Sequence, residues 1–190
     1  MAIPFGEASA LESASAKVND RPQNDIMPTT VTKEAPLFSI SDMEVLVVDD
    51  NESNAKILSM LLKKNALKVM TVSDGQQAVD IIAQDTNRFK LVFMDNLMPK
   101  LTGPDATKII RSKYEYAYII VGATGNVSSD DIADFIEHGV NLVIPKPLSI
   151  KQIKKVLSYI EKHGPELSSS HVLVETSGPN ETSILEAIEK

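Results

Sequence analysis

Carboxylates follow two apolar runs in this 190-residue chain, at positions where an acid could do chemistry. Asp49 and Asp50 come directly after residues 45–48, and Asp95 comes directly after residues 91–94. Such runs are typical of strands buried on both faces of a parallel sheet, and ligands bind where those strands end. These acids are therefore candidates for holding a cation or attacking an electrophile, although each could instead cap a helix or turn.

Two later strand ends carry groups that suit phosphate. Thr124 follows the apolar run 118–123, and Lys146 follows the short run 141–144. A hydroxyl and an ammonium group can both bind phosphoryl oxygens, although Lys146 could be a solvated surface cation and Thr124 could bond its own backbone. Three carboxylates at one edge repel unless a cation joins them. Because the chain has no cysteine, and no histidine lies near these acids in the sequence, we expect that cation to be Mg2+.

Strands and amphipathic helices alternate strictly along the chain. The expected strands are 43–48, 67–72, 91–94, 118–123 and 141–144, and a helix with a 3.6-residue apolar period follows each of them. This pattern predicts an α/β fold with a doubly wound, five-stranded parallel sheet. In the flavodoxin-like strand order 2-1-3-4-5, the residues named above meet at one edge.

The chain divides into three expected segments. Residues 1–42 lack a sustained apolar period and predict a flexible leader or linker, and residues 43–163 hold the predicted domain. Residues 164–190 predict a tail that is mostly flexible. Within that tail, a short helix is expected from about Thr182, with Ile184, Leu185 and Ile188 on one side.

Composition excludes several classes of function. A net charge of -7 argues against nucleic-acid binding, which relies on clustered lysine and arginine. No apolar run reaches the ~18 residues of a membrane span, and the first residues do not resemble a secretory signal. We therefore expect a cytoplasmic protein without direct membrane insertion, and a nuclear protein or one tethered as part of a larger kinase stays open as an alternative. The absence of cysteine also excludes disulfides and thiolate catalysis.

Four motifs carry a family resemblance. Val-Val-Asp-Asp-Asn at 47–51, Met-Asp-Asn-Leu-Met-Pro at 94–99, Ala-Thr-Gly at 123–125 and Pro-Lys-Pro at 145–147 stand in this order. Together they resemble the receiver domain of two-component response regulators, and in particular the receivers of eukaryotic hybrid histidine kinases. The resemblance covers residues 43–163.

The resemblance implies a role for each candidate residue. Asp95 would be the phosphoacceptor, Asp50 would ligate Mg2+, and Asp49 would help directly or through water. The carbonyl of Leu97 would complete the protein's metal ligands, while Thr124 and Lys146 would contact the phosphoryl group. A cis peptide bond between Lys146 and Pro147 is also implied.

By the same resemblance, the partner is a histidine kinase or a histidine phosphotransfer protein, and phosphorylation alters the face formed by the fourth helix, fifth strand and fifth helix. Such a domain catalyses its own phosphorylation and dephosphorylation rather than turning over a separate substrate. The chain departs from many receivers at Val143, where they carry Tyr or Phe. Two alternatives stay open: a pseudo-receiver that binds a partner without phosphorylation, and a metal-dependent phosphatase, although Leu97 replaces the second aspartate of many such enzymes.

Overall fold

The computed structural model describes residues 38–65, 67–125, 128–177 and 183–190, all within the unit Ala35–Lys190. In these residues the central sheet consists of β1 (Glu44–Val48), β2 (Lys68–Val72), β3 (Phe89–Asp95), β4 (Ile119–Thr124) and β5 (Leu142–Pro145). All neighbouring strands are parallel, in the order β2-β1-β3-β4-β5. The predicted doubly wound α/β fold and its strand order are therefore confirmed.

Five helices connect and follow these strands. They are α1 (Glu52–Lys63), α2 (Gly75–Gln84), α3 (Gly103–Tyr114), α4 (Ser129–Glu137) and α5 (Ile150–His163). Each begins after a polar residue whose side chain accepts a backbone N–H of the first turn, as Ser149 does in a complete capping box for α5. Because these caps fix where each helix starts, they also fix the loops that follow the strands.

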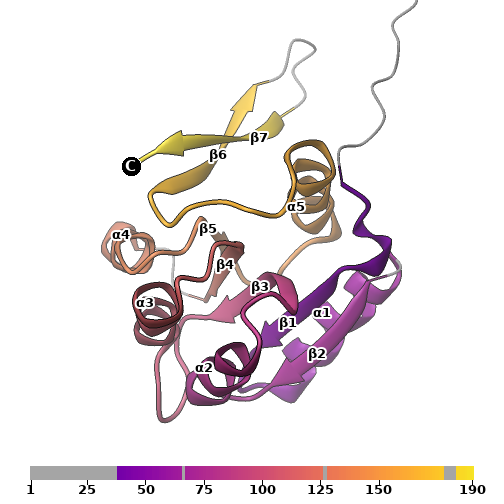
Figure 1. The fold of residues 1–190 in the computed structure, drawn as a ribbon. Coiled ribbons are helices and arrows are strands. Elements are labelled where there is room, and N and C mark those ends of the chain that lie inside the picture. Colours follow the sequence, from indigo (N-terminus) through magenta and orange to yellow (C-terminus); the bar gives the residue numbers. More distant parts are fainter. Residues whose placement is uncertain (1–37, 66, 126–127, 178–182) are drawn as a thin grey trace, which may run out of the picture. The chain divides into compact units, whose positions relative to one another are not determined.

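Helices cover both faces of the central sheet (Figure 1), and the core lies in two layers, one on each face. Val45 and Val47 of β1 belong to the buried cluster that includes α1 and α5, whereas Leu46 and Val48 belong to the cluster with α2, α3 and α4. Side chains alternate between the two faces of a strand, so a strand covered on both sides must be apolar at every position. This explains the continuous apolar runs in the sequence.

Gly103 lets α3 begin directly against the end of β3. A Cβ atom at this position would lie 2.0 Å from the backbone oxygen of Asp95, so a larger residue cannot fit without moving the loop. The backbone N–H of Gly103 also donates to the carbonyl of Asn96 over 2.9 Å. The glycine therefore anchors the loop that follows Asp95.

Beyond α5, the chain forms a two-stranded antiparallel sheet of β6 (His171–Ser177) and β7 (Ser183–Glu189). The prediction of a short helix from about Thr182 is therefore wrong, because residues 183–189 form the strand β7. Leu185 is buried and Ala187 half-buried, whereas Glu186 and Ile188 between and beside them are exposed. That alternation has a period of two, and pairing with β6 satisfies the backbone that a helix would have satisfied internally.

Residues 1–37 of the predicted leader, which spans residues 1–42, lie outside the described residues. Residues 40–42 form the short 3-10 helix η1 (Ile40–Asp42), and the backbone N–H of Phe38 donates to the carbonyl of Glu161 in α5 over 3.3 Å. Among the described residues, none of the helices has both the length and the apolar character needed to span a membrane.

Candidate functional site

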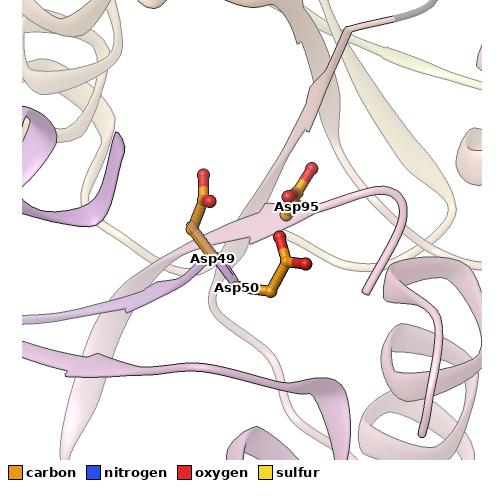
Figure 2. Close-up of side chains that lie close together, drawn as sticks. All are labelled: Asp49, Asp50 and Asp95. Atoms are coloured by element: carbon orange, nitrogen blue, oxygen red, sulfur yellow. The ribbon is translucent and has the colours of Figure 1, made fainter. Parts of the chain in front are cut away.

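Three carboxylates meet where β1 and β3 end. Asp49 and Asp50 follow β1, Asp95 is the last residue of β3, and all three side chains lie close together in Figure 2. One oxygen from each carboxylate lies within 4.8 Å of the others. The sheet order explains this, because β1 and β3 are hydrogen-bonded neighbours whose carboxyl ends share one edge.

Lys146 brings a positive charge to these acids from the loop after β5. Its Nζ lies 2.8 Å from Oδ2 of Asp49 and 2.7 Å from Oδ2 of Asp95. The backbone N–H of Lys146 donates to the carbonyl of Thr124 over 2.7 Å, and the peptide bond to Pro147 is cis, as predicted. The structure therefore unites groups from three strands around one ammonium ion.

Burial shapes the charges of the site. Asp49 and Asp95 are each only 7% exposed, whereas Asp50 is open to solvent. Burial raises the pKa of Asp95 above its ordinary value, and the hydrogen bond and charge of Lys146 oppose this shift without cancelling it. Burial also acts to lower the pKa of Lys146, but its hydrogen bonds to Asp49 and Asp95 together hold that pKa above the ordinary value.

Two asparagines support the site and were not predicted from the sequence. Asn54 in the first turn of α1 donates from Nδ2 to Oδ1 of Asp49 over 3.4 Å, beside a backbone bond from Asn51 of 3.0 Å. Asn96 lies next to Asp95 and donates to Oγ1 of Thr124, which is buried, over 3.5 Å. Both asparagines lie within a few residues of a candidate acid in the sequence, and this proximity was the signal that could have identified them.

Two further predicted residues lie around this group. Leu97 is in the loop between β3 and α3 and is 70% exposed. Val143 lies in β5 and is half-buried against the core layer of α2, α3 and α4. The position where many receivers carry an aromatic ring therefore packs as a small core residue.

An apolar pocket opens beside the acids. It runs between α1 and the loop that leads into α5, and Asp49, Asp95 and Lys146 form its polar side. Its apolar lining comes mainly from Ile57, Leu58, Leu61, Pro147 and Leu148. Of these, Ile57 is 58% exposed. A reacting group at Asp95 thus adjoins a surface that another molecule can cover.

The arrangement suits one kind of chemistry. Of the charged groups described here, three carboxylates face a single ammonium, so the site retains an excess of negative charge that a hard cation can balance. Carboxylate oxygen is the ligand that Mg2+ prefers, and a carboxylate beside a cation can act as a nucleophile toward phosphorus.

Comparison with known proteins agrees with this geometry. A family model for the response regulator receiver domain matches residues 45–158. Transcription factor SKN7 from Chaetomium thermophilum is 33% identical over 151 residues, which is 76% of this chain and 20% of that protein. The osmosensing histidine protein kinase SLN1 from Saccharomyces cerevisiae is 30% identical over 122 residues, or 62% of this chain and 10% of that protein. The chain thus spans a fifth or less of these two relatives.

A solved structure gives the same result. The co-crystal structure of the Saccharomyces cerevisiae histidine phosphotransfer protein Ypd1 with the receiver domain of Ssk1 matches with a TM-score of 0.59 and 27% identity, over 65% of this chain and 92% of that chain. The family match, the strand order and the meeting of acids and lysine at one edge all agree. This chain therefore belongs to the response regulator receiver domain family of two-component signalling.

Proposed function

We propose that this receiver accepts a phosphoryl group on Asp95 in a Mg2+-dependent reaction and signals by changing conformation. The observation that carries the proposal is the contact of Asp95 with Lys146 at 2.7 Å inside a cluster of three carboxylates. The donor would be a phosphohistidine on a histidine kinase or a histidine phosphotransfer protein. Family membership and the likeness to a receiver solved with Ypd1 support this choice of donor.

The metal site would use Asp50, Asp95 and the backbone carbonyl of Leu97, with Asp49 as a direct or water-mediated ligand. The donor set fits, because all of these groups offer oxygen and the three carboxylates already lie within 4.8 Å of one another. When bound, Mg2+ would neutralise part of the charge on the phosphoryl oxygens. Asp50 is exposed, so it can exchange water for a metal at low cost.

In the transfer step, an oxygen of the Asp95 carboxylate would attack phosphorus while the bond from phosphorus to the histidine nitrogen breaks. The electron pair of that bond stays on the imidazole nitrogen, which then takes a proton from solvent. Lys146 would move its hydrogen bond from the Asp95 carboxylate to a phosphoryl oxygen, and Thr124 would donate its hydroxyl to another. Both groups would thereby stabilise the charge that is spread over the phosphoryl oxygens in the transition state.

The donor would dock on the apolar pocket between α1 and the loop before α5. Ile57 and Met60 on α1 and Ile150 at the start of α5 are exposed apolar residues at 58%, 54% and 46%. A few well-packed residues near the centre of an interface contribute most of the binding energy. Replacement of Ile57 by Ser should therefore slow phosphotransfer from a histidine phosphotransfer protein about 10-fold more than phosphorylation by a small donor. The matched control is Ile188→Ser, an exposed apolar residue in β7.

The test of the function itself uses acetyl phosphate and intact mass spectrometry. With Mg2+, the wild type and the control Asp80→Asn should each gain one phosphoryl group, and Asp95→Asn should gain none. Chelation of the metal should abolish the gain. An unchanged wild-type mass in a folded, Mg2+-treated sample would instead favour the pseudo-receiver, and steady hydrolysis of an unrelated phosphoester would favour the phosphatase.

A further inference from the structure

The hairpin of β6 and β7 is an addition to the receiver. The family model ends at residue 158, whereas β6 begins at His171. In Figure 1 the hairpin lies beside α5 and the edge strand β5.

Asn141, the residue before β5, is the main attachment point. Its side chain is completely buried and donates from Nδ2 to the carbonyls of Ser168 and His171, each over 3.0 Å. Its own carbonyl accepts the backbone N–H of Leu173 over 2.6 Å. Three bonds thus tie the start of the hairpin to the amino end of β5.

Apolar and terminal contacts extend this attachment across the neighbouring helices. Leu173 and Leu185 are 2% and 7% exposed and belong to the same buried cluster as Leu157 and Ile160 of α5. Lys190 donates from Nζ to the carbonyl of Ile136 in α4 over 2.7 Å. The hairpin therefore contacts all three parts of the face formed by α4, β5 and α5.

The strand under the hairpin also leads directly to the candidate site. Asn141 precedes β5 and Lys146 follows it, with only the four residues of the strand between them. β5 is an edge strand, so within the central sheet only β4 holds it. A displacement of Lys146 can therefore move the whole strand and the hairpin bonds at its other end.

We propose that the hairpin is an intramolecular ligand of the α4–β5–α5 face and that its docking opposes phosphorylation of Asp95. This inference rests on the proposed function. Docking favours the position of β5 in which Lys146 bonds both Asp49 and Asp95. A phosphoryl group on Asp95 draws Lys146 away from that position and loosens the hairpin, which exposes the face to a partner.

Coupling of this kind is reciprocal, so it can be measured from both ends. From the site end, the full chain is phosphorylated with acetyl phosphate and Mg2+ while intact mass reports the phosphorylated fraction. Hydrogen exchange of the peptide that contains Leu173 should become about 5-fold faster in the phosphorylated protein. Full phosphorylation with unchanged exchange overturns this inference and leaves the proposed function intact. A protein that gains no phosphoryl group overturns both.

From the hairpin end, the variant is Leu185→Ser, which removes a buried contact, and the matched control is Ile188→Ser, which is 49% exposed in the same strand. The probe is beryllofluoride with Mg2+, an analogue of the phosphoryl group. Leu185→Ser should bind it about 5-fold more tightly than the wild type, and Ile188→Ser should bind it equally well.

A second variant keeps the test decisive if Leu185→Ser does not fold. Lys190→Met removes the bond from Nζ to Ile136 together with the charge of the lysine, and it keeps the buried leucines of the hairpin. It should shift beryllofluoride affinity in the same direction by a smaller factor. If both variants speed exchange in the hairpin while neither changes that affinity, docking and phosphorylation are independent and the inference is overturned.

Discussion

The two ends of β5 are built on opposite principles. At its amino end, Asn141 is fully satisfied: Oδ1 accepts from Arg111 over 2.7 Å and from the backbone of Ile120 over 2.9 Å, while Nδ2 donates to Ser168 and His171. At its carboxyl end, the ammonium of Lys146 bonds Asp49 and Asp95, and the carboxylate of Asp50 lies beside those two acids. At the first end every polar atom of the Asn141 side chain has its partners, whereas the second end keeps unbalanced charge.

The amino end of β5 thus serves mainly to hold the fold together, whereas its carboxyl end carries the reactive groups. Buried polar groups with every partner in place rigidify a fold, because breaking any bond leaves a group unpaired. A site with charge left over is ready to bind a cation and to change partners when a ligand arrives. We therefore expect substitutions at the carboxyl end to change the chemistry directly. Substitutions at the amino end should mainly change stability, and they should reach the chemistry only through the docked hairpin.

The largest expected effect breaks the amino end. Asn141→Ala leaves the guanidinium of Arg111, the N–H of Ile120 and two carbonyls without this partner, so the free energy of unfolding should fall by about 3 kcal/mol. Urea denaturation measures it. The control Asn65→Ala loses one bond to Leu61 at the end of α1 and should cost under about 1 kcal/mol. Equal losses in both variants would contradict the special role of Asn141.

The next effect breaks the carboxyl end. Lys146→Met removes the charge that contacts Asp95, so phosphorylation by acetyl phosphate should slow about 100-fold. The rate of mass gain measures this. Lys151→Met, an exposed position in α5, should stay within about twofold of the wild type. A Lys146→Met variant that reacts at the wild-type rate would remove the lysine from the mechanism.

A third change sharpens the comparison by acting on the loop after Asp95. Gly103→Ala places a Cβ against the Asp95 carbonyl and should cost about 2 kcal/mol of stability as well as lower Mg2+ affinity. Gly125→Ala is the control, because no atom lies within 4 Å of its added Cβ, and it should change stability by under about 0.5 kcal/mol. Urea denaturation and magnesium titration report the two quantities, and unaltered values for Gly103→Ala would show that the loop adapts freely.

The smallest effect concerns Lys100, which donates to the buried Asp74 carboxylate over 2.8 Å while remaining 67% exposed. The hydrogen bond from Lys100 lowers the pKa of Asp74, so this pair stabilises the fold at neutral pH and loses its contribution as pH falls through that lowered pKa. Lys100→Met should cost under about 1 kcal/mol at pH 7 and flatten the loss of stability below about pH 4. Acid unfolding of the wild type and of Lys100→Met is followed by circular dichroism. If the two unfolding curves coincide, the contribution of this pair is refuted.

The sequence was most informative where local chemistry decides the structure. Strands buried on both faces must be apolar throughout, and helix starts carry capping residues such as Asp74 and Ser149. The carboxyl ends of the strands therefore followed from the residues to within one residue. The meeting of Asp49, Asp95 and Lys146 followed once these strands were placed in the order 2-1-3-4-5. The roles of these residues in phosphate transfer stay predictions.

Features that depend on distant partners could not be predicted. Residues 184–188 fit one side of a helix, yet β7 forms because β6 offers backbone bonds and α5 offers an apolar surface for Leu185. Asn141 gave no signal either, since a lone asparagine before an apolar run is ordinary in a loop. Its importance comes from five residues elsewhere in the chain that bond to its side chain and backbone carbonyl.

The most direct test of the central claim is the location of the transferred group. The full chain is phosphorylated with acetyl phosphate and Mg2+, the acyl phosphate is reduced with borohydride, and peptides are sequenced by tandem mass spectrometry. We predict that the reduced residue is Asp95 and that its formation requires Mg2+. A modification found on Asp49, on Asp50 or on a histidine, with Asp95 unchanged, would contradict the account.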